Sequence, residues 1–296
     1  GLVCWIAYKL PPPSTSDFDQ VWVAARALLA GQDPYAVVPI QGTHYPFLYP
    51  LPAALIAVPV AWVPVPTARV LWAVVSGTLF AWAALRHGRG LPPALLSASF
   101  LNAVIQGQWS PLLTAAAALP ALSWIYAAKP TIGAALFAAF PSRRALVGGA
   151  ALVLLATVVM PSWPLAWWTS VDAGTRMLPY PPIVARPAGA LLLLALARWR
   201  QPEGRLLAGL ACVPQTLGLY ETLPLFLLAR TRWQGYVLAC LSYLAAFLQV
   251  ALAPRLADMS LDRLATERWP VLFACLYLPA LLMVIMPPRR GERQGM

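Results

Sequence analysis

Charged residues are scarce in this sequence. Only 10% of the 296 residues are Asp, Glu, Lys or Arg, whereas a soluble domain carries about 25%. Hydrophobic residues make up 60% of the chain, and apolar runs recur along its whole length. This composition excludes a soluble domain and also a soluble domain with one membrane anchor. We predict an all-α integral membrane protein, in which lipid solvates the outer faces of the helices.

Residues that build metal and cofactor sites are also few. The chain has two histidines, His44 and His87, so a catalytic relay based on histidine is not expected. No P-loop, dinucleotide-binding glycine motif or nucleophile elbow is present. The cysteines lie in apolar segments without the spacing of metal ligands: Cys4, Cys212, Cys240 and Cys275. We therefore expect no metal and no bound cofactor.

Six apolar segments are the clearest candidates for membrane spans, because a spanning helix needs about 20 apolar residues and at least about 17. They are 70–85, 92–106, 145–160, 183–197, 234–252 and 271–286. Prolines interrupt two further apolar regions, 111–140 and 206–228, where we expect short broken helices. The apolar stretch that ends near Leu10 is short for a span, so we expect the first transmembrane helix to be incomplete.

Basic residues between the spans predict an orientation. Five loops at one predicted side hold twelve of the 21 basic residues but only Glu203 and Glu292 of the ten acidic ones. Basic residues are enriched in cytoplasmic loops, so we predict that this side is cytoplasmic. The twelve residues are Arg86, Arg89, Arg143, Arg144, Arg198, Arg200, Arg205, Arg230, Arg232, Arg289, Arg290 and Arg293.

This topology makes residues 1–296 a single polytopic transmembrane domain with a long first external loop, 11–69. The loop contains an amphipathic stretch, 18–30, and an apolar stretch bounded by prolines, 48–63. If 48–63 crossed the membrane, Arg86 and Arg89 would fall outside and the charge bias would weaken. We therefore expect 48–63 to form a helix that lies on the outer surface.

Two ionisable sites stand out against the apolar background. Asp17 and Asp19 follow the first apolar stretch, where either could act as a general base in a partly desolvated cleft. Alternatively, one or both cap the next helix, because Ser, Thr and Asp are good capping residues. Lys129 is the only charged residue in region 111–140. It either binds an anionic ligand or extends from a helix end to lipid headgroups.

Two further polar positions lie at the ends of apolar segments. Gln106-Gly107-Gln108 follows one predicted span, where its amides could bind a sugar hydroxyl or cap a helix. Glu221, next to Tyr220, is either functional or paired with an external arginine. The charges of loops 161–182 and 254–270 are more typical of solvated or mutually paired surface groups.

Several of these segments, taken in order, resemble glycosyltransferase family 87, a family of mannosyltransferase-like enzymes with the GT-C fold that use polyprenyl-phosphate sugars. Asp17-Phe18 and the sequence AARALLAGQDPY at 24–35 resemble the family's first external loop. FLYPLPA at 47–53 is similar to its Tyr-Pro-Pro-Leu segment. Gly107-Gln108 and Lys129-Pro130 resemble two later signatures. The resemblance covers about residues 1–145.

The resemblance implies a helical bundle of GT-C type in a bacterial inner membrane, with its active site at the outer face. The donor would be a polyprenyl-phosphate sugar, and the acceptor a lipid or glycan hydroxyl. The family's catalytic base matches Asp17, with Asp19 as the second candidate. Lys129 or Arg69 would stabilise the leaving phosphate. The other residues expected to bind substrate are Gln108, His44, Tyr49 and Glu221.

One departure from the family favours a different class of function. The family's later histidine-containing motif corresponds to PQTLGLYE at 214–221, which has no histidine. The alternative is an inactive GT-C-like scaffold that serves as a structural subunit of a larger membrane complex. A transporter is a third class, but its sites usually accompany internal repeats, and no convincing repeat is present.

Overall fold

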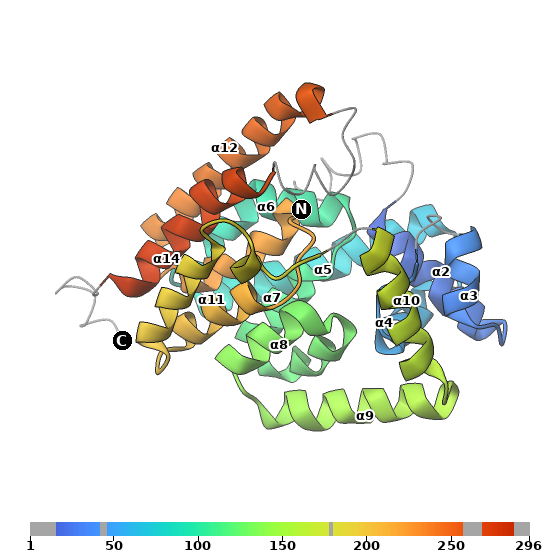
Figure 1. Cartoon of the computed structure of the whole chain (residues 1–296). Coiled ribbons are helices and arrows are strands. Elements are labelled where there is room, and N and C mark those ends of the chain that lie inside the picture. The colour runs from blue at the N-terminus through green and yellow to red at the C-terminus, as the bar shows by residue number, and fades with distance from the viewer. Residues whose placement is uncertain (1–15, 42–45, 178–179, 257–267, 287–296) are drawn as a thin grey trace.

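The computed structural model describes residues 16–41, 46–177, 180–256 and 268–286 (Figure 1). Within these ranges the secondary structure is helical and contains no strand. The elements, in chain order, are α2 (Asp17–Leu29), α3 (Pro34–Gln41), α4 (Leu51–Ala57), η1 (Val58–Val60), α5 (Val65–His87), η2 (Pro92–Leu96), α6 (Ala98–Ile105), α7 (Ser110–Ala118), η3 (Pro120–Ala128), α8 (Pro130–Ala139), α9 (Arg143–Val159), α10 (Trp163–Met177), η4 (Ile183–Ala185), η5 (Gly189–Arg198), α11 (Pro202–Cys212), η6 (Leu219–Leu228), α12 (Arg232–Leu256), η7 (Phe273–Tyr277) and α14 (Leu278–Ile285).

Three helices in the described ranges are long and apolar enough to cross a membrane. They are Val65–His87, Arg232–Leu252 and Arg268–Ile285, the last of which contains η7 and α14. They coincide with the segments predicted at 70–85, 234–252 and 271–286 and are candidate spans by length and composition. The segment predicted at 145–160 forms α9, which continues into α10 after a bend of 97°. If this bent pair is one span, the described ranges contain four.

Two of the predicted spans do not form single helices of spanning length. Segment 92–106 divides at Ser97, whose hydroxyl accepts a hydrogen bond from the Phe100 amide at 3.1 Å and so caps α6. In segment 183–197 the backbone turns at Ala188, with φ of 59°, and then forms the ten-residue 3₁₀ helix η5. A 3₁₀ helix rises about 2.0 Å per residue, so η5 is too short for a hydrocarbon core of about 30 Å.

The two regions interrupted by prolines are broken as predicted. Region 111–140 forms α7, η3 and α8, with Pro120 beginning η3 and Pro130 beginning α8. Region 206–228 contains most of α11 and all of η6, joined by the non-helical segment 213–218. These breaks place polar residues, among them Lys129 and Glu221, at helix ends inside the fold.

The segment predicted to be the first external loop, 11–69, forms short helices where the structure describes it. Its amphipathic stretch forms α2, as predicted. The stretch 48–63 contains α4 and η1, and a helix from Leu51 to Val60 is too short to span a membrane. Within the protein, α4 is not an exposed helix. Leu51, Ala53 and Ala57 are fully buried, because α4 packs against α2, α9 and η3.

The arginine-rich segments meet at one end of the long helices. Arg198 Nη2 donates to the Ile285 carbonyl at 3.2 Å, and Arg230 Nη1 donates to the Met286 carbonyl at 3.0 Å. The backbone amide of Gly90 also donates to the Ala229 carbonyl at 3.2 Å. The termini at Val65, Leu252 and Arg268 therefore belong to the opposite end of the three candidate spans.

Candidate functional site

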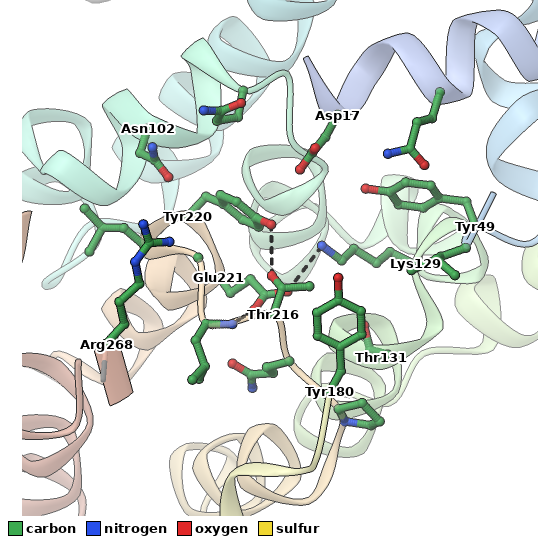
Figure 2. A pocket seen from close by; sticks show the side chains of 18 of the residues that line it. Asp17, Tyr49, Asn102, Lys129, Thr131, Tyr180, Thr216, Tyr220, Glu221 and Arg268 are labelled. Atoms are coloured by element: carbon green, nitrogen blue, oxygen red, sulfur yellow. Dashed lines mark hydrogen bonds and ion pairs between the residues drawn. The ribbon is translucent and has the colours of Figure 1, made fainter. Parts of the chain in front are cut away.

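A cavity of about 1060 Å³ opens near that opposite end. Its lining comes from α2, α6, α10, α12, the junction of η3 with α8, and segments 48–50 and 214–221. Among the described residues, the lining contains two carboxylates and two basic side chains: Asp17, Glu221, Lys129 and Arg268. Figure 2 shows Lys129 and Arg268 extending into the cavity from different sides.

The N-terminus of α2 determines which aspartate faces the cavity. The Ser16 hydroxyl accepts from the Phe18 amide at 3.3 Å and donates to the Gln106 carbonyl at 2.8 Å. The Asp19 carboxylate accepts from the Ser16 amide at 3.0 Å, which completes a capping box. Because Ser16 and Asp19 cap the helix, the Asp17 side chain is left to line the cavity.

Asp19 and Arg69 form an ion pair that joins α2 to α5. Arg69 Nε donates to Asp19 Oδ1 at 2.7 Å, and Arg69 Nη2 contacts the second carboxylate oxygen. Neither residue belongs to the described lining of the cavity. The structure therefore does not bring the second candidate base, or the second candidate cation, to the cavity that contains Asp17.

Asp17 is held in place by Gln108. The Gln108 side-chain amide donates to Asp17 Oδ2, and Lys129 Nζ donates to the Gln108 side-chain oxygen at 3.4 Å. Burial raises the pKa of Asp17 above the ordinary 3.8, while the nearby charge of Lys129 and the Gln108 hydrogen bond oppose that rise. The amide at position 108 thus positions the carboxylate and links it to the lysine.

Gly107 allows this arrangement through its backbone. Its φ is +62°, a left-handed conformation that glycine adopts at little cost. A Cβ at this position would lie 2.6 Å from Phe18 Cβ and 2.9 Å from Ser16 Oγ. The turn at 106–108 therefore packs directly against the start of α2, which explains why Gln108 reaches Asp17.

Lys129 lies between η3 and α8 and is mostly buried, with 12% of its side chain exposed. Its Nζ is 3.5 Å from Glu221 Oε1 and 5.3 Å from the centroid of the Tyr220 ring. This geometry contradicts the interpretation that Lys129 extends to lipid headgroups. The lysine instead connects Glu221 to the Gln108–Asp17 pair.

Glu221 is buried at the start of η6, with 2% of its side chain exposed. Its Oε2 accepts from the Leu217 backbone amide at 3.0 Å. Leu217 has a φ of +58°, so segment 213–218 turns sharply to deliver that amide. The described basic partner of Glu221 is Lys129, and not an external arginine as one interpretation of the sequence proposed.

The remaining predicted residues have different outcomes. Tyr49 lines the cavity, near Lys129 in Figure 2. His44 lies outside the residues that the structure describes. Sequence reasoning missed Arg268, which it grouped with the loop charges of 254–270. Its position directly before the last apolar run was a signal that could have identified it.

The described residues contain no group of three or more His, Cys, Asp or Glu side chains that could hold a metal ion. The cavity lining contains the positioned carboxylate of Asp17, the side chains of Lys129 and Arg268, and several amides and hydroxyls. Such a set can accept a proton from a hydroxyl and bind an anionic group. Comparison with protein-family models, curated proteins and solved structures finds no match to this chain.

Proposed function

We propose that the protein is a membrane glycosyltransferase of the GT-C class that uses Asp17 as its general base. It transfers a mannose-like sugar from a polyprenyl-phosphate donor to a hydroxyl of a lipid or glycan acceptor. The observation that carries this proposal is the position of Asp17: it lines the cavity, Gln108 holds it, and burial raises its pKa.

The reaction is a single displacement. Asp17 accepts the proton of the acceptor hydroxyl, and the acceptor oxygen bonds to the anomeric carbon of the sugar. The bond from that carbon to the phosphate oxygen breaks, and polyprenyl phosphate leaves with the electron pair. Attack opposite to the leaving group inverts the configuration. A carboxylate whose pKa is raised toward neutral pH accepts a proton more readily.

The cavity suits a sugar and its phosphate. Its volume of about 1060 Å³ is slightly above the usual range for small-molecule sites, roughly 300–1,000 Å³. The aromatic side chains of Tyr49, Trp167 and Tyr180 border it, beside amides and hydroxyls that can bind sugar hydroxyl groups. This lining supports a polar ligand with one apolar face, as a hexose has.

We also propose that the long helices cross a bacterial inner membrane with the cavity at the outer face. Large apolar side chains are exposed on the outside of the long helices, among them Leu85, Val158 and Phe247. These side chains are expected to face lipid. The arginine-rich end would face the cytoplasm, because basic residues favour that side.

The test is sugar transfer by membranes that contain the full chain, with radiolabelled polyprenyl-phosphate mannose as donor. We expect Asp17→Asn to lower the rate by about 10² or more, the lower end of the effect of a general base. Asp172→Asn is a matched control, because Asp172 is half-exposed and pairs with Arg176 on α10. Its rate should equal that of the parent.

Three results would contradict the proposal in different ways. If Asp17→Asn retains full activity, Asp17 is not the base. If Asp172→Asn loses as much activity as Asp17→Asn, the loss does not depend on the position of the carboxylate in the cavity. If a folded protein transfers no hexose from any polyprenyl-phosphate donor, the inactive scaffold becomes the better interpretation.

A further inference from the structure

Two buried nitrogen atoms at one side of the cavity lack partners among the described residues. Arg268 Nε and Gln249 Nε2 are both shielded from solvent, and neither makes a hydrogen bond there. Both residues line the cavity. A buried donor without an acceptor is destabilising, so this side of the cavity is suited to a ligand that accepts hydrogen bonds.

The charges of the lining indicate what kind of ligand would fit this side of the cavity. Lys129 already contacts Glu221 at 3.5 Å and is linked through Gln108 to Asp17. Its single positive charge faces two carboxylates, so Lys129 has no excess positive charge with which to bind an anionic ligand. Arg268 is the other basic residue in the described lining. Its guanidinium can bind two oxygens of a phosphate at once.

Arg268 and Gln249 are at the same end of neighbouring helices. Arg268 begins the last candidate span, and Gln249 is near the C-terminal end of the span in α12. If these helices cross a membrane, both side chains lie near its boundary with water, the depth at which a lipid phosphate is found. In Figure 2, Arg268 lies on the side of the cavity away from Lys129.

An apolar path leads out of the cavity at this point. Ala246 and Val250 of α12 line the cavity, and they are neighbours of Gln249 on the helix. Val250 is 71% exposed and Phe247 is 68% exposed, so the lining continues onto the apolar outer surface of α12. A ligand with a phosphate head and a hydrocarbon tail matches this change from polar to apolar surface.

We propose that Arg268 and Gln249 form the binding site for the phosphate of an isoprenoid-type lipid, whose tail leaves the cavity over Ala246 and Val250. The inference deepens the proposed function and rests on it in two respects, the isoprenoid character of the tail and the assignment of this lipid as the sugar donor. The sugar then extends from the phosphate toward Asp17. The positive charge of Arg268 stabilises the phosphate as it departs.

The experiment measures binding to the full chain in phosphatidylcholine nanodiscs, without any sugar transfer. Three probes separate the parts of the ligand: farnesyl phosphate, farnesol without the phosphate, and inorganic phosphate without the tail. We expect farnesyl phosphate to bind more tightly than either of the others. Arg268→Gln should weaken its binding about ten- to hundredfold, the range for a lost hydrogen bond to a charged group.

Companion variants separate binding from folding. Arg268→Lys keeps the charge but loses Nε, so its binding should be intermediate. Gln249→Leu should weaken binding about tenfold, because it removes one hydrogen-bond donor to the charged phosphate. Arg176→Gln is the matched control, since Arg176 is exposed and pairs with Asp172. All variants should elute as the parent does in size-exclusion chromatography.

The outcomes distinguish this site from the proposed function. Equal binding of farnesyl phosphate to the parent and Arg268→Gln would overturn the site, even if sugar transfer depends on Asp17. If farnesol or inorganic phosphate binds as tightly as farnesyl phosphate, the site does not recognise head and tail together, and the proposal is overturned. Binding that depends on Arg268, in a protein that transfers no sugar, would keep the site and refute the transferase.

Discussion

At the scale of residues, Lys129 connects the two carboxylates of the cavity but contacts them differently. It pairs directly with Glu221, whereas it reaches Asp17 through the Gln108 amide. Removing one partner from a buried pair costs about 3–5 kcal/mol, because the other charge is left uncompensated. Glu221 therefore holds Lys129 in place, and Lys129 adjusts the protonation of Asp17.

The first prediction follows from the sign of that adjustment. Lys129 lowers the pKa of Asp17, although burial raises it more strongly. The base must be deprotonated to act, so the transfer rate rises with pH through this pKa. Lys129→Gln removes the lowering influence, and we expect the acidic limb of the rate–pH profile to move to higher pH.

The measurement is the transfer rate across the acidic and neutral range. Lys129→Gln leaves Glu221 without its partner, so the double variant Lys129→Gln/Glu221→Gln should be more stable than either single variant. It should show the same shift. The exposed control Arg176→Gln should not move the profile. An acidic limb that stays in place in the double variant would show that Lys129 does not act on the base.

At the scale of elements, the site depends on how α2 docks against the turn that precedes α7. Ser16 Oγ donates to the Gln106 carbonyl, and Gly107 packs against Phe18. These contacts bring together segments that are about 90 positions apart, as the separation of 91 between Asp17 and Gln108 shows. The docking, and not α2 alone, positions the base.

The second prediction tests this docking with two glycines. Gly107 and Gly31 have nearly the same positive φ, 62° and 67°. A Cβ on Gly107 would meet Phe18 Cβ at 2.6 Å, whereas a Cβ on Gly31 would meet nothing within 4 Å. Both substitutions to alanine introduce strain of about 1 kcal/mol. Overpacking at Gly107 adds about 1–3 kcal/mol.

We expect Gly107→Ala to lower the melting temperature more than Gly31→Ala does, and to reduce sugar transfer strongly. Gly31→Ala should keep near-parental transfer, since Gly31 does not line the cavity. Thermal unfolding in detergent and the transfer rate provide the two measurements. Equal melting temperatures and equal rates for both variants would show that the turn does not support Asp17.

The sequence allowed the helical class, the breaks at Pro120 and Pro130, and the amphipathic α2 to be predicted, because each depends on local composition. The break at Ser97 and the 3₁₀ geometry of η5 were not predicted, because hydropathy measures how apolar a segment is and not its backbone geometry. The choice between Asp17 and Asp19 was also open. Both suit a helix start. Contacts distant in sequence separate their roles: Arg69 pairs with Asp19, and Gln108 holds Asp17 in the cavity.

At the scale of the whole molecule, the two ends of the long helices differ in charge and in chemistry. Arg198 and Arg230 bond to backbone carbonyls at one end. The cavity with Asp17 and Arg268 lies near the other. A lipid-linked donor must meet the cavity at the correct membrane face, so the orientation of the molecule is part of the proposed function.

The third prediction concerns this orientation and uses single cysteines in a background without the native ones. Asp172 is exposed on α10 beside Val171, which lines the cavity, and Arg200 is exposed at the arginine-rich end. In intact cells, a membrane-impermeant maleimide should label Asp172→Cys. Arg200→Cys should react only after lysis, because the arginine-rich end is expected to face the cytoplasm. The reverse pattern would place the cavity in the cytoplasm, and labelling of both positions in intact cells would mean that no membrane separates the two ends.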